Sequence, residues 1–287
     1  MSAITPDQIP AQSQDRQPAH ESEMTPAPIY DRDSYKGSEK LKGKVALITG
    51  GDSGIGRSVA VLYAKEGADV AVSYLDEHED AKKVKELVEA EGQKCLLLPG
   101  DLTSEPFCKE IVQKTADEYG RLDILVSNAA EQYMEEDWDG IDAARLGSIF
   151  GTNVFPMFYL SKAAIPLMKE GSSIIITTSI NAYKGNAPLL SYSTTKGANL
   201  AFLRSLSQRL IEKKIRVNGV APGPIWTPFI PDAFPADKVE GFGKQVPMKR
   251  AGQPVEVATC FVFLASEDAS YMTGQVLHPN GGVVVGA

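Results

Sequence analysis

The residues that decide the fold are Val45-Ala46-Leu47-Ile48-Thr49-Gly50-Gly51-Asp52-Ser53-Gly54-Ile55-Gly56. The apolar, partly β-branched run at 45–48 predicts a buried strand. Glycines then cluster before an amphipathic stretch, which predicts a helix from Ile55 to Glu66. Glycine permits the positive φ of a tight turn, and a helix N-terminus offers free N–H groups to an anion. A strand, a glycine-rich turn and a helix in this order predict a site for the pyrophosphate of a dinucleotide.

The same alternation continues toward the C-terminus. Short apolar runs predict further strands at 70–74, 94–98, 124–127, 173–178, 217–220 and 275–278. Amphipathic stretches predict helices at 79–91, 105–119 and 189–212, with another long helical stretch before residue 173. Because the strands are apolar throughout, both faces of their sheet must be covered. The sequence therefore predicts an α/β fold of the Rossmann type, a doubly wound, mostly parallel seven-stranded sheet with helices on both faces.

Residues 1–40 differ in composition from the rest. They are rich in Pro, Gln, Ser, Asp and Glu and have little periodic apolar content. Such a segment cannot bury enough surface to offset its ordering entropy alone. We expect a polar, extended N-terminal arm over residues 1–40, either disordered or laid along the body or a neighbouring subunit. A single dinucleotide-binding catalytic domain is expected over residues 41–287.

The composition excludes several classes of function. A formal net charge of −8, without a run of Lys and Arg, argues against nucleic-acid binding. The cysteines and histidines are scattered, so no metal site is expected. No apolar run has the length of a membrane span, and the first residues lack the apolar segment of a secretory signal. A cytoplasmic protein without membrane contact is expected.

A second motif that carries chemistry lies in the predicted helix 189–212. Tyr192 and Lys196 are four residues apart, which places both on one helix face. A phenol is a poor base at neutral pH because its ordinary pKa is about 10. A neighbouring ammonium, or a positively charged nicotinamide, favours the phenolate and is expected to lower that pKa. The pair is therefore a candidate for proton transfer.

Together these motifs resemble the short-chain dehydrogenase/reductase family. The spacing TGxxxGIG from Thr49 to Gly56 is that of its compact single-domain form, and the resemblance covers about residues 41–286. The arm is similar to the N-terminal extension of a subgroup that includes glucose/ribitol dehydrogenase-like proteins and bacterial general stress oxidoreductases. The segment 222–228, Pro-Gly-Pro-Ile-Trp-Thr-Pro, resembles that subgroup as well.

The resemblance implies a catalytic set. Ser179 lies thirteen residues before Tyr192, where the family places its substrate-orienting serine. Asn153 lies where the family uses an asparagine to hold a water that links the lysine to solvent. The implied reaction moves hydride between a nicotinamide dinucleotide and a carbonyl or alcohol, with Tyr192 as general acid or base. The catalytic residues are expected to be Asn153, Ser179, Tyr192 and Lys196.

The resemblance also implies a long set of cofactor contacts: Gly50, Asp52, Ser53, Gly54, Ile55, Gly56, Tyr74, Leu75, Asp101, Leu102, Asn128, Ala129, Ala130, Tyr192, Lys196, Pro222, Gly223, Ile225 and Thr227. A carboxylate at the end of the second strand selects NAD, and a nearby Arg selects NADP. Tyr74 occupies that position, so neither signature is present. No cation lies in this turn or at positions 51–53, whereas three carboxylates lie near. NAD(H) is therefore favoured, and NADP(H) stays open.

The substrate end is less defined. Residues 228–250 contain several aromatic residues, prolines and glycines, and are expected to form a mobile lid. Ser179, Tyr183 and Tyr192 are expected to contact the substrate, and Asn186 is a further candidate. Aldehydes, ketones, sugars and polyols are all compatible. A dinucleotide sensor or scaffold without turnover is the alternative function, and the C-terminal segment 251–286 resembles the family's subunit contact, which implies a homotetramer.

Overall fold

The computed structural model of this protein describes residues 9–135 and 137–285. Within them, parallel strands form one sheet in the order β3-β2-β1-β4-β5-β6-β7. The strands are β1 (Val45–Thr49), β2 (Asp69–Tyr74), β3 (Cys95–Pro99), β4 (Ile124–Ser127), β5 (Ser173–Thr177), β6 (Arg216–Val220) and β7 (Val276–Leu277). The predicted fold class is confirmed, and every pairing in the sheet is parallel.

The connections between strands are helical. The α-helices are α1 (Gly54–Lys65), α2 (His78–Ala90), α3 (Glu105–Tyr119), α4 (Ala143–Asn153), α5 (Phe155–Ala164), α6 (Asn181–Lys184), α7 (Leu190–Arg209), α8 (Ala236–Val239) and α9 (Pro254–Ala265). Short 3₁₀ turns lie at Glu21–Glu23, Ala187–Leu189, Ile211–Lys213 and Glu267–Ala269. None of the helices in the described ranges is both long and apolar enough to cross a bilayer.

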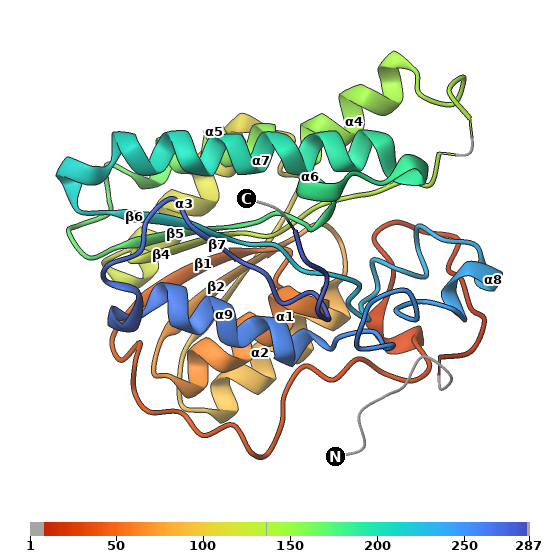
Figure 1. The fold of residues 1–287 in the computed structure, drawn as a ribbon. Coiled ribbons are helices and arrows are strands. Elements are labelled where there is room, and N and C mark those ends of the chain that lie inside the picture. The colour runs from red at the N-terminus through yellow and green to blue at the C-terminus, as the bar shows by residue number, and fades with distance from the viewer. Residues whose placement is uncertain (1–8, 136, 286–287) are drawn as a thin grey trace.

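Two apolar cores sandwich the sheet. Figure 1 shows α1, α2 and α9 on one face and α3, α5 and α7 on the other. Successive residues of β1 face opposite sides, so Ile48 joins the core under α1 and α9 while Leu47 joins the core under α3 and α5. Both side chains are fully buried, which explains why the strands read as continuous apolar runs.

The long helical stretch expected before β5 is broken in two. α4 ends at Asn153 and α5 begins at Phe155, with Val154 between them at φ −120° and ψ −54°. Pro156 occupies the first turn of α5, where its missing N–H costs no hydrogen bond. The break places Asn153 at a helix end rather than in a helix interior.

The arm lies along the body over its described residues. Ile9 and Met24 are buried in an apolar cluster with Trp226, Ile230 and Val239. The indole N–H of Trp226 donates to the Pro26 carbonyl at 2.8 Å. Figure 1 shows this part of the arm beside the segment that carries α8.

The second half of the arm follows α9 and α1. The backbone of Ile29 accepts from the Val255 N–H at 3.1 Å and donates to the Gln253 side chain at 2.9 Å. Farther along, Tyr35 Oη and the Ser38 N–H both donate to the Glu66 carboxylate at the end of α1. Few apolar residues are needed because hydrogen bonds to the body satisfy much of the arm's polar backbone.

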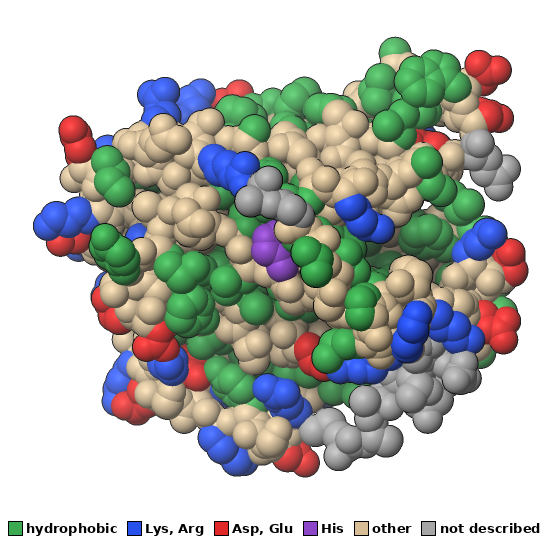
Figure 2. Space-filling view, in the orientation of Figure 1, with side chains coloured by type: hydrophobic (Ala, Val, Ile, Leu, Met, Phe, Trp, Pro, Cys, Tyr) green, Lys and Arg blue, Asp and Glu red, His purple; other side chains and the backbone are tan. Residues whose placement is uncertain are grey.

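The surface of the body is mixed in charge. On the face shown in Figure 2, Lys and Arg side chains are interspersed with Asp and Glu around the rim. Apolar side chains lie among them.

The docking of the arm can be tested by comparing two methionines. Met24 is 4% exposed in the arm cluster, and Met248 is 63% exposed. We expect Met24→Ala to lower the free energy of unfolding by about 2 kcal/mol because it leaves a cavity against Trp226. Met248→Ala should change it by less than about 0.5 kcal/mol. Urea denaturation followed by tryptophan fluorescence measures both, and equal effects would show that the arm is not packed in solution.

Candidate active site

One cavity of about 600 Å³ lies at the carboxyl ends of the strands. Its walls come from the loops after β1, β2, β3, β4, β5 and β6. The sheet order reverses between β1 and β4, and open α/β sheets bind ligands in the crevice at such a switch point. The cavity has the volume typical of a site for a cofactor with a small substrate.

The glycine-rich turn forms the floor of this cavity. Gly50 and Gly54 have φ of +59° and +50°, a region that side chains rarely adopt. A Cβ on Gly50 would lie 3.0 Å from the Cα of Ala129. Gly56 does not line the cavity: a Cβ there would lie 1.8 Å from the Gly50 carbonyl oxygen, so this glycine lets α1 pack on its own turn.

The N-terminus of α1 opens onto the cavity. Ser53 is the N-cap residue, and its side chain makes no capping hydrogen bond. Ser53, Gly54 and Ile55 all line the cavity. Backbone N–H groups at a helix N-terminus, together with the helix dipole, favour a bound anion such as pyrophosphate.

Asn128 connects three strands beside this turn. Its side-chain nitrogen donates to the carbonyls of Thr49 and Gly50 at 3.2 and 3.1 Å. Its side-chain oxygen accepts from the Thr177 hydroxyl at 3.1 Å. Asn128 therefore ties the ends of β1, β4 and β5 together.

All the other expected cofactor contacts line the cavity. They are Gly50, Asp52, Ser53, Gly54, Ile55, Tyr74, Leu75, Asp101, Leu102, Asn128, Ala129, Ala130, Tyr192, Lys196, Pro222, Gly223, Ile225 and Thr227. Residues at the ends of five strands meet those of α7 here because the carboxyl ends of parallel strands share one edge of the sheet.

The tyrosine and lysine of α7 lie deep in the same cavity. Tyr192 is 8% exposed and Lys196 is 2% exposed. Lys196 Nζ donates to the Thr177 carbonyl at 3.0 Å and lies 5.5 Å from the centre of the Tyr192 ring. Ser179, at the end of β5, lines the cavity and forms a hydrogen bond with the Tyr192 phenol. The phenol, the serine hydroxyl and the ammonium therefore converge on one space.

Burial dominates the acid–base properties of this pair. It raises the pKa of Tyr192 to about 12, although the hydrogen bond from Ser179 opposes the shift. Burial also lowers the pKa of Lys196 to about 7. The lowered phenol pKa expected from sequence is therefore not produced by the chain's own side chains. The cause is desolvation, which disfavours the charged form of both groups.

Asn153 does not line the cavity and is held by the backbone. Its side chain exchanges two hydrogen bonds with Glu131, accepting from the N–H and donating to the carbonyl, each at 2.8 Å. Its amide nitrogen also donates to Thr195 Oγ1 at 3.1 Å. Asn153 thus fixes the segment after β4 against α7, one residue before Lys196.

Tyr183 was expected at the substrate, and the cavity lining within residues 9–135 and 137–285 does not include it. Its ring packs edge-on against His278, with 4.8 Å between ring centres. Tyr183 lies in the short helix α6, which turns it toward β7 rather than toward Tyr192. Asn186, two residues after α6, does line the cavity.

Several residues of the cavity wall were not expected from the sequence, among them three in the arm. Gln17, Pro18 and Ala19 line the cavity although they belong to the arm. Glu77 lines it from the segment before α2, and Asp232 lines it from the expected lid. An arm residue gives no signal in the sequence, because its docking depends on contacts with residues distant in the chain, such as the hydrogen bond from Gln17 to Gln132.

Several of these wall residues are carboxylates whose charged form is disfavoured. Burial raises the pKa of Glu77 to about 8, and the neighbouring Asp76 and Asp52 add to the shift. Burial also raises the pKa of Asp52 to about 6. Burial raises the pKa of Asp232 to about 7, and hydrogen bonding to Gln17 and Ala19 partly opposes this. The cavity is therefore a poorly solvated space bordered by acidic groups.

Most of the chain is similar to known proteins. A family model described as enoyl-(acyl carrier protein) reductase matches residues 50–284. General stress protein 39 of Bacillus subtilis (strain 168) is 58% identical over 277 residues, covering 96% of this chain and 97% of that protein. Glucose and ribitol dehydrogenase of Daucus carota is 52% identical over 284 residues, covering 97% and 98%.

The descriptions of two further similar proteins name a cofactor. NADPH-dependent aldehyde reductase 1, chloroplastic, of Arabidopsis thaliana is 52% identical over 283 residues, covering 96% of this chain and 98% of that protein. Among solved structures, a short chain dehydrogenase from Burkholderia cenocepacia J2315 in complex with NADP has a TM-score of 0.80 at 28% identity. That match covers 85% of this chain and 98% of the other.

The pKa of Asp232 predicts a pH-dependent stability. The folded protein raises this pKa from 3.8 to about 7. The stabilising contribution of the Asp232 carboxyl group to the free energy of unfolding is therefore fully present below pH 3.8 and is lost as the pH rises through 7. We expect Asp232→Asn to gain thermal stability over the wild type as the pH is raised from about 5 to about 8. Scanning calorimetry measures the difference, with Asp237→Asn at an exposed position as the control. A difference in Tm that does not change with pH would contradict the shift.

Proposed function

This chain belongs to the short-chain dehydrogenase/reductase family and is an NAD(P)-dependent oxidoreductase, and we propose that Tyr192 is its general acid and base. The observation that carries the proposal is that the phenol of Tyr192, the hydroxyl of Ser179 and the ammonium of Lys196 border one buried cavity. Hydride transfer to a carbonyl carbon leaves negative charge on oxygen, and these are the donors that such an oxygen needs.

The residues present fit a nicotinamide dinucleotide. The floor at Gly50 and Gly54 brings the backbone close to a ligand, and the first turn of α1 offers N–H groups to a pyrophosphate. Lys196 would donate to the hydroxyls of the nicotinamide ribose, and Thr227 to the carboxamide. When bound, the dinucleotide supplies or accepts the hydride.

The proton is transferred by side chains of the protein. Ser179 and Tyr192 hydrogen-bond to the substrate oxygen and orient it. Tyr192 gives its proton to that oxygen during reduction and takes it back during oxidation. The positive charge of Lys196 stabilises the phenolate left behind, and a positively charged neighbour opposes the rise in pKa that burial causes. Asn153 supports the proton path by holding Glu131 and Thr195 in place beside Lys196.

Removing the phenolic hydroxyl tests this role. We expect Tyr192→Phe to lower kcat by about 100- to 10,000-fold, the range for loss of a positioned general acid, while the Kd for dinucleotide changes little. Tyr183→Phe is the matched control, because that ring lies against His278 outside the cavity. Turnover is followed at the nicotinamide absorbance with aldehydes, ketones, sugars and polyols. Substantial residual turnover in Tyr192→Phe would remove Tyr192 from the mechanism.

For the nucleotide, the proposal is a preference for NAD(H). Glu77 and Asp52 border the end of the cavity formed by the loop after β2, which receives the adenosine ribose in this class of fold. A carboxylate accepts a hydrogen bond from a ribose hydroxyl and repels a 2′-phosphate. The relative named NADPH-dependent and the solved structure with NADP make both nucleotides necessary in the test.

Isothermal titration of the wild type decides between the two. We expect NADH to bind at least about tenfold more tightly than NADPH, because burial near two carboxyl groups penalises a dianionic phosphate. The ionic strength is held constant, since screening weakens the repulsion. Tighter binding of NADPH by the same factor would overturn the preference.

The substrate proposed is a small carbonyl or alcohol compound: an aldehyde, ketone, sugar or polyol. The cavity wall near Tyr192 combines apolar Leu189 and Phe229 with polar Asn186, which suits a short carbon chain bearing hydroxyl groups. The names of the relatives point to both aldehydes and sugar alcohols. A sensor without turnover remains the alternative, and retention of Tyr192 and Lys196 in the cavity argues against it.

Assembly and location are also proposals. Large apolar side chains are exposed on α5, where Phe155 and Phe158 are 44% and 53% accessible, and near the C-terminus at Tyr271. Exposed apolar groups of this size favour contacts between subunits, and we propose a homotetramer. The cysteines Cys95, Cys108 and Cys260 are free thiols, which is in keeping with a reducing cytoplasm.

A further inference from the structure

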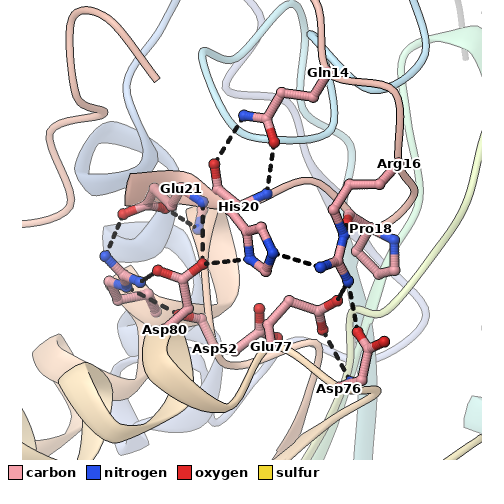
Figure 3. Close-up of polar contacts among 11 residues, drawn as sticks. Gln14, Arg16, Pro18, His20, Glu21, Asp52, Asp76, Glu77 and Asp80 are labelled. Carbon is pink, nitrogen blue, oxygen red and sulfur yellow. Dashed lines mark hydrogen bonds and ion pairs between the residues drawn. The ribbon is translucent and has the colours of Figure 1, made fainter. Parts of the chain in front are cut away.

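The arm forms part of the cavity wall. Its residues Gln17, Pro18 and Ala19 border the same cavity as Asp52 and Glu77. Gln17 reaches across to the segment after β4, where its side chain donates to the Gln132 carbonyl at 2.9 Å. Figure 3 shows Pro18, Asp52 and Glu77 in this part of the cavity wall, with Arg16 close by.

A buried ionic network fixes this part of the arm. Arg57, on α1, pairs with Glu21 of the arm and with Asp80 of α2, the latter at 2.8 Å, and all three side chains are nearly inaccessible. Glu21 also accepts from the Gly54 N–H at 2.6 Å, and its own N–H donates to Asp80 at 3.0 Å. Removing one partner from a buried ion pair is strongly unfavourable. If the arm left the body, Arg57 would lose Glu21, one of its two carboxylate partners. The arm is therefore anchored at the glycine-rich turn itself.

Arg16 extends from this anchored segment to the carboxylates after β2. Its Nη2 lies 2.7 Å from Asp76 Oδ1 and 3.1 Å from Glu77 Oε1. Its Nε donates to the Pro18 carbonyl at 2.7 Å, and its Nη1 contacts His20. The guanidinium is thus oriented by several bonds rather than free to swing (Figure 3).

The burial of the two partners differs sharply. The Glu77 side chain is 1% exposed and borders the cavity, whereas the Arg16 side chain is 37% exposed and is not among the lining residues. Arg16 therefore acts on the cavity through Glu77. The guanidinium of Arg16 already pairs with two carboxyl groups, so it is not available to pair with a phosphate.

We propose that Arg16 is a positioning residue that holds the Glu77 carboxyl group in place as an acceptor for the 2′-hydroxyl of the adenosine ribose, so that the arm helps to select NAD(H) over NADP(H). This inference rests on the nucleotide preference proposed above. It assigns nucleotide selection to a contact between the arm and the body, in a chain where Tyr74 ends β2 without a carboxylate. Without the guanidinium, the Glu77 carboxyl group would lose the arm side chain that fixes its position at the cavity.

A competing role is that Arg16 receives a 2′-phosphate directly. The two roles predict opposite selectivities. If Arg16 binds a 2′-phosphate, removing it weakens the binding of NADPH. If Arg16 positions Glu77, removing it weakens the binding of NADH.

The experiment compares full-length variants by isothermal titration with NADH and with NADPH. We expect Arg16→Gln to weaken NADH binding about tenfold, the effect of losing one hydrogen bond to a charged group, and to leave NADPH binding within about twofold. Glu77→Gln should weaken NADH similarly and strengthen NADPH. Arg16→Lys keeps the positive charge and should therefore bind NADH more tightly than Arg16→Gln does. Lys40→Gln is the matched control, because it removes an arm cation that pairs with Asp268 outside the cavity.

A double-mutant cycle separates positioning from general structure. If Arg16 acts through Glu77, the two glutamine substitutions combined should weaken NADH binding no more than either alone. Additive losses, equal losses for both nucleotides without rescue by Arg16→Lys, or a selective loss of NADPH would each overturn the proposal, as would unchanged binding. Because these are binding measurements, they stand apart from the turnover test of Tyr192. A wild type that binds NADPH more tightly would overturn the nucleotide preference and this inference together, while the hydride-transfer function would stand.

Discussion

The start of α1 is the point on which the rest of the site depends. Gly50 and Gly54 adopt φ values that other residues rarely reach, and the close approach of Gly50 to Ala129 leaves no room for a side chain. This geometry exposes the first turn of α1 to the cavity and brings the loops after β1 and β4 together. The arm is fastened at the same place, since Glu21 accepts the Gly54 N–H. One turn therefore shapes the floor of the cavity, lies beside the switch point of the sheet and holds the arm.

Desolvation is the common electrostatic feature of the cavity. It raises the pKa of the phenol Tyr192 and of the carboxyl groups Glu77 and Asp232, and it lowers the pKa of the ammonium of Lys196. Each group is moved toward its neutral form, as expected where water is scarce. In such a space a charge on a ligand interacts strongly with the wall. The pKa values of Tyr192 and Lys196 are therefore set by burial in the cavity, and a motif of two residues does not define them.

The arm shows how a polar segment can be structural without a core of its own. Its apolar anchors are few, and Met24 and Ile9 use a cluster that belongs to Trp226 and the segment 228–250. Its charged residues are buried only where the body supplies partners, as Arg57 does. The arm thereby contacts the glycine-rich turn, the loop after β2 and the segment 228–250.

The sequence by itself determined the α/β class, the strands and most helices, and the residues at the strand ends that border the cavity, because each depends on periodicity or on a motif within a short window. The residues it missed or misplaced depend on contacts distant in the chain. Tyr183 turns toward His278, and Asn153 sits at a helix break made possible by Pro156. Only the tertiary structure brought the arm to the cavity and Glu77 into its wall. No local pattern records which distant backbone a polar segment will meet, since that outcome is decided by burial and by the partners available for each charge.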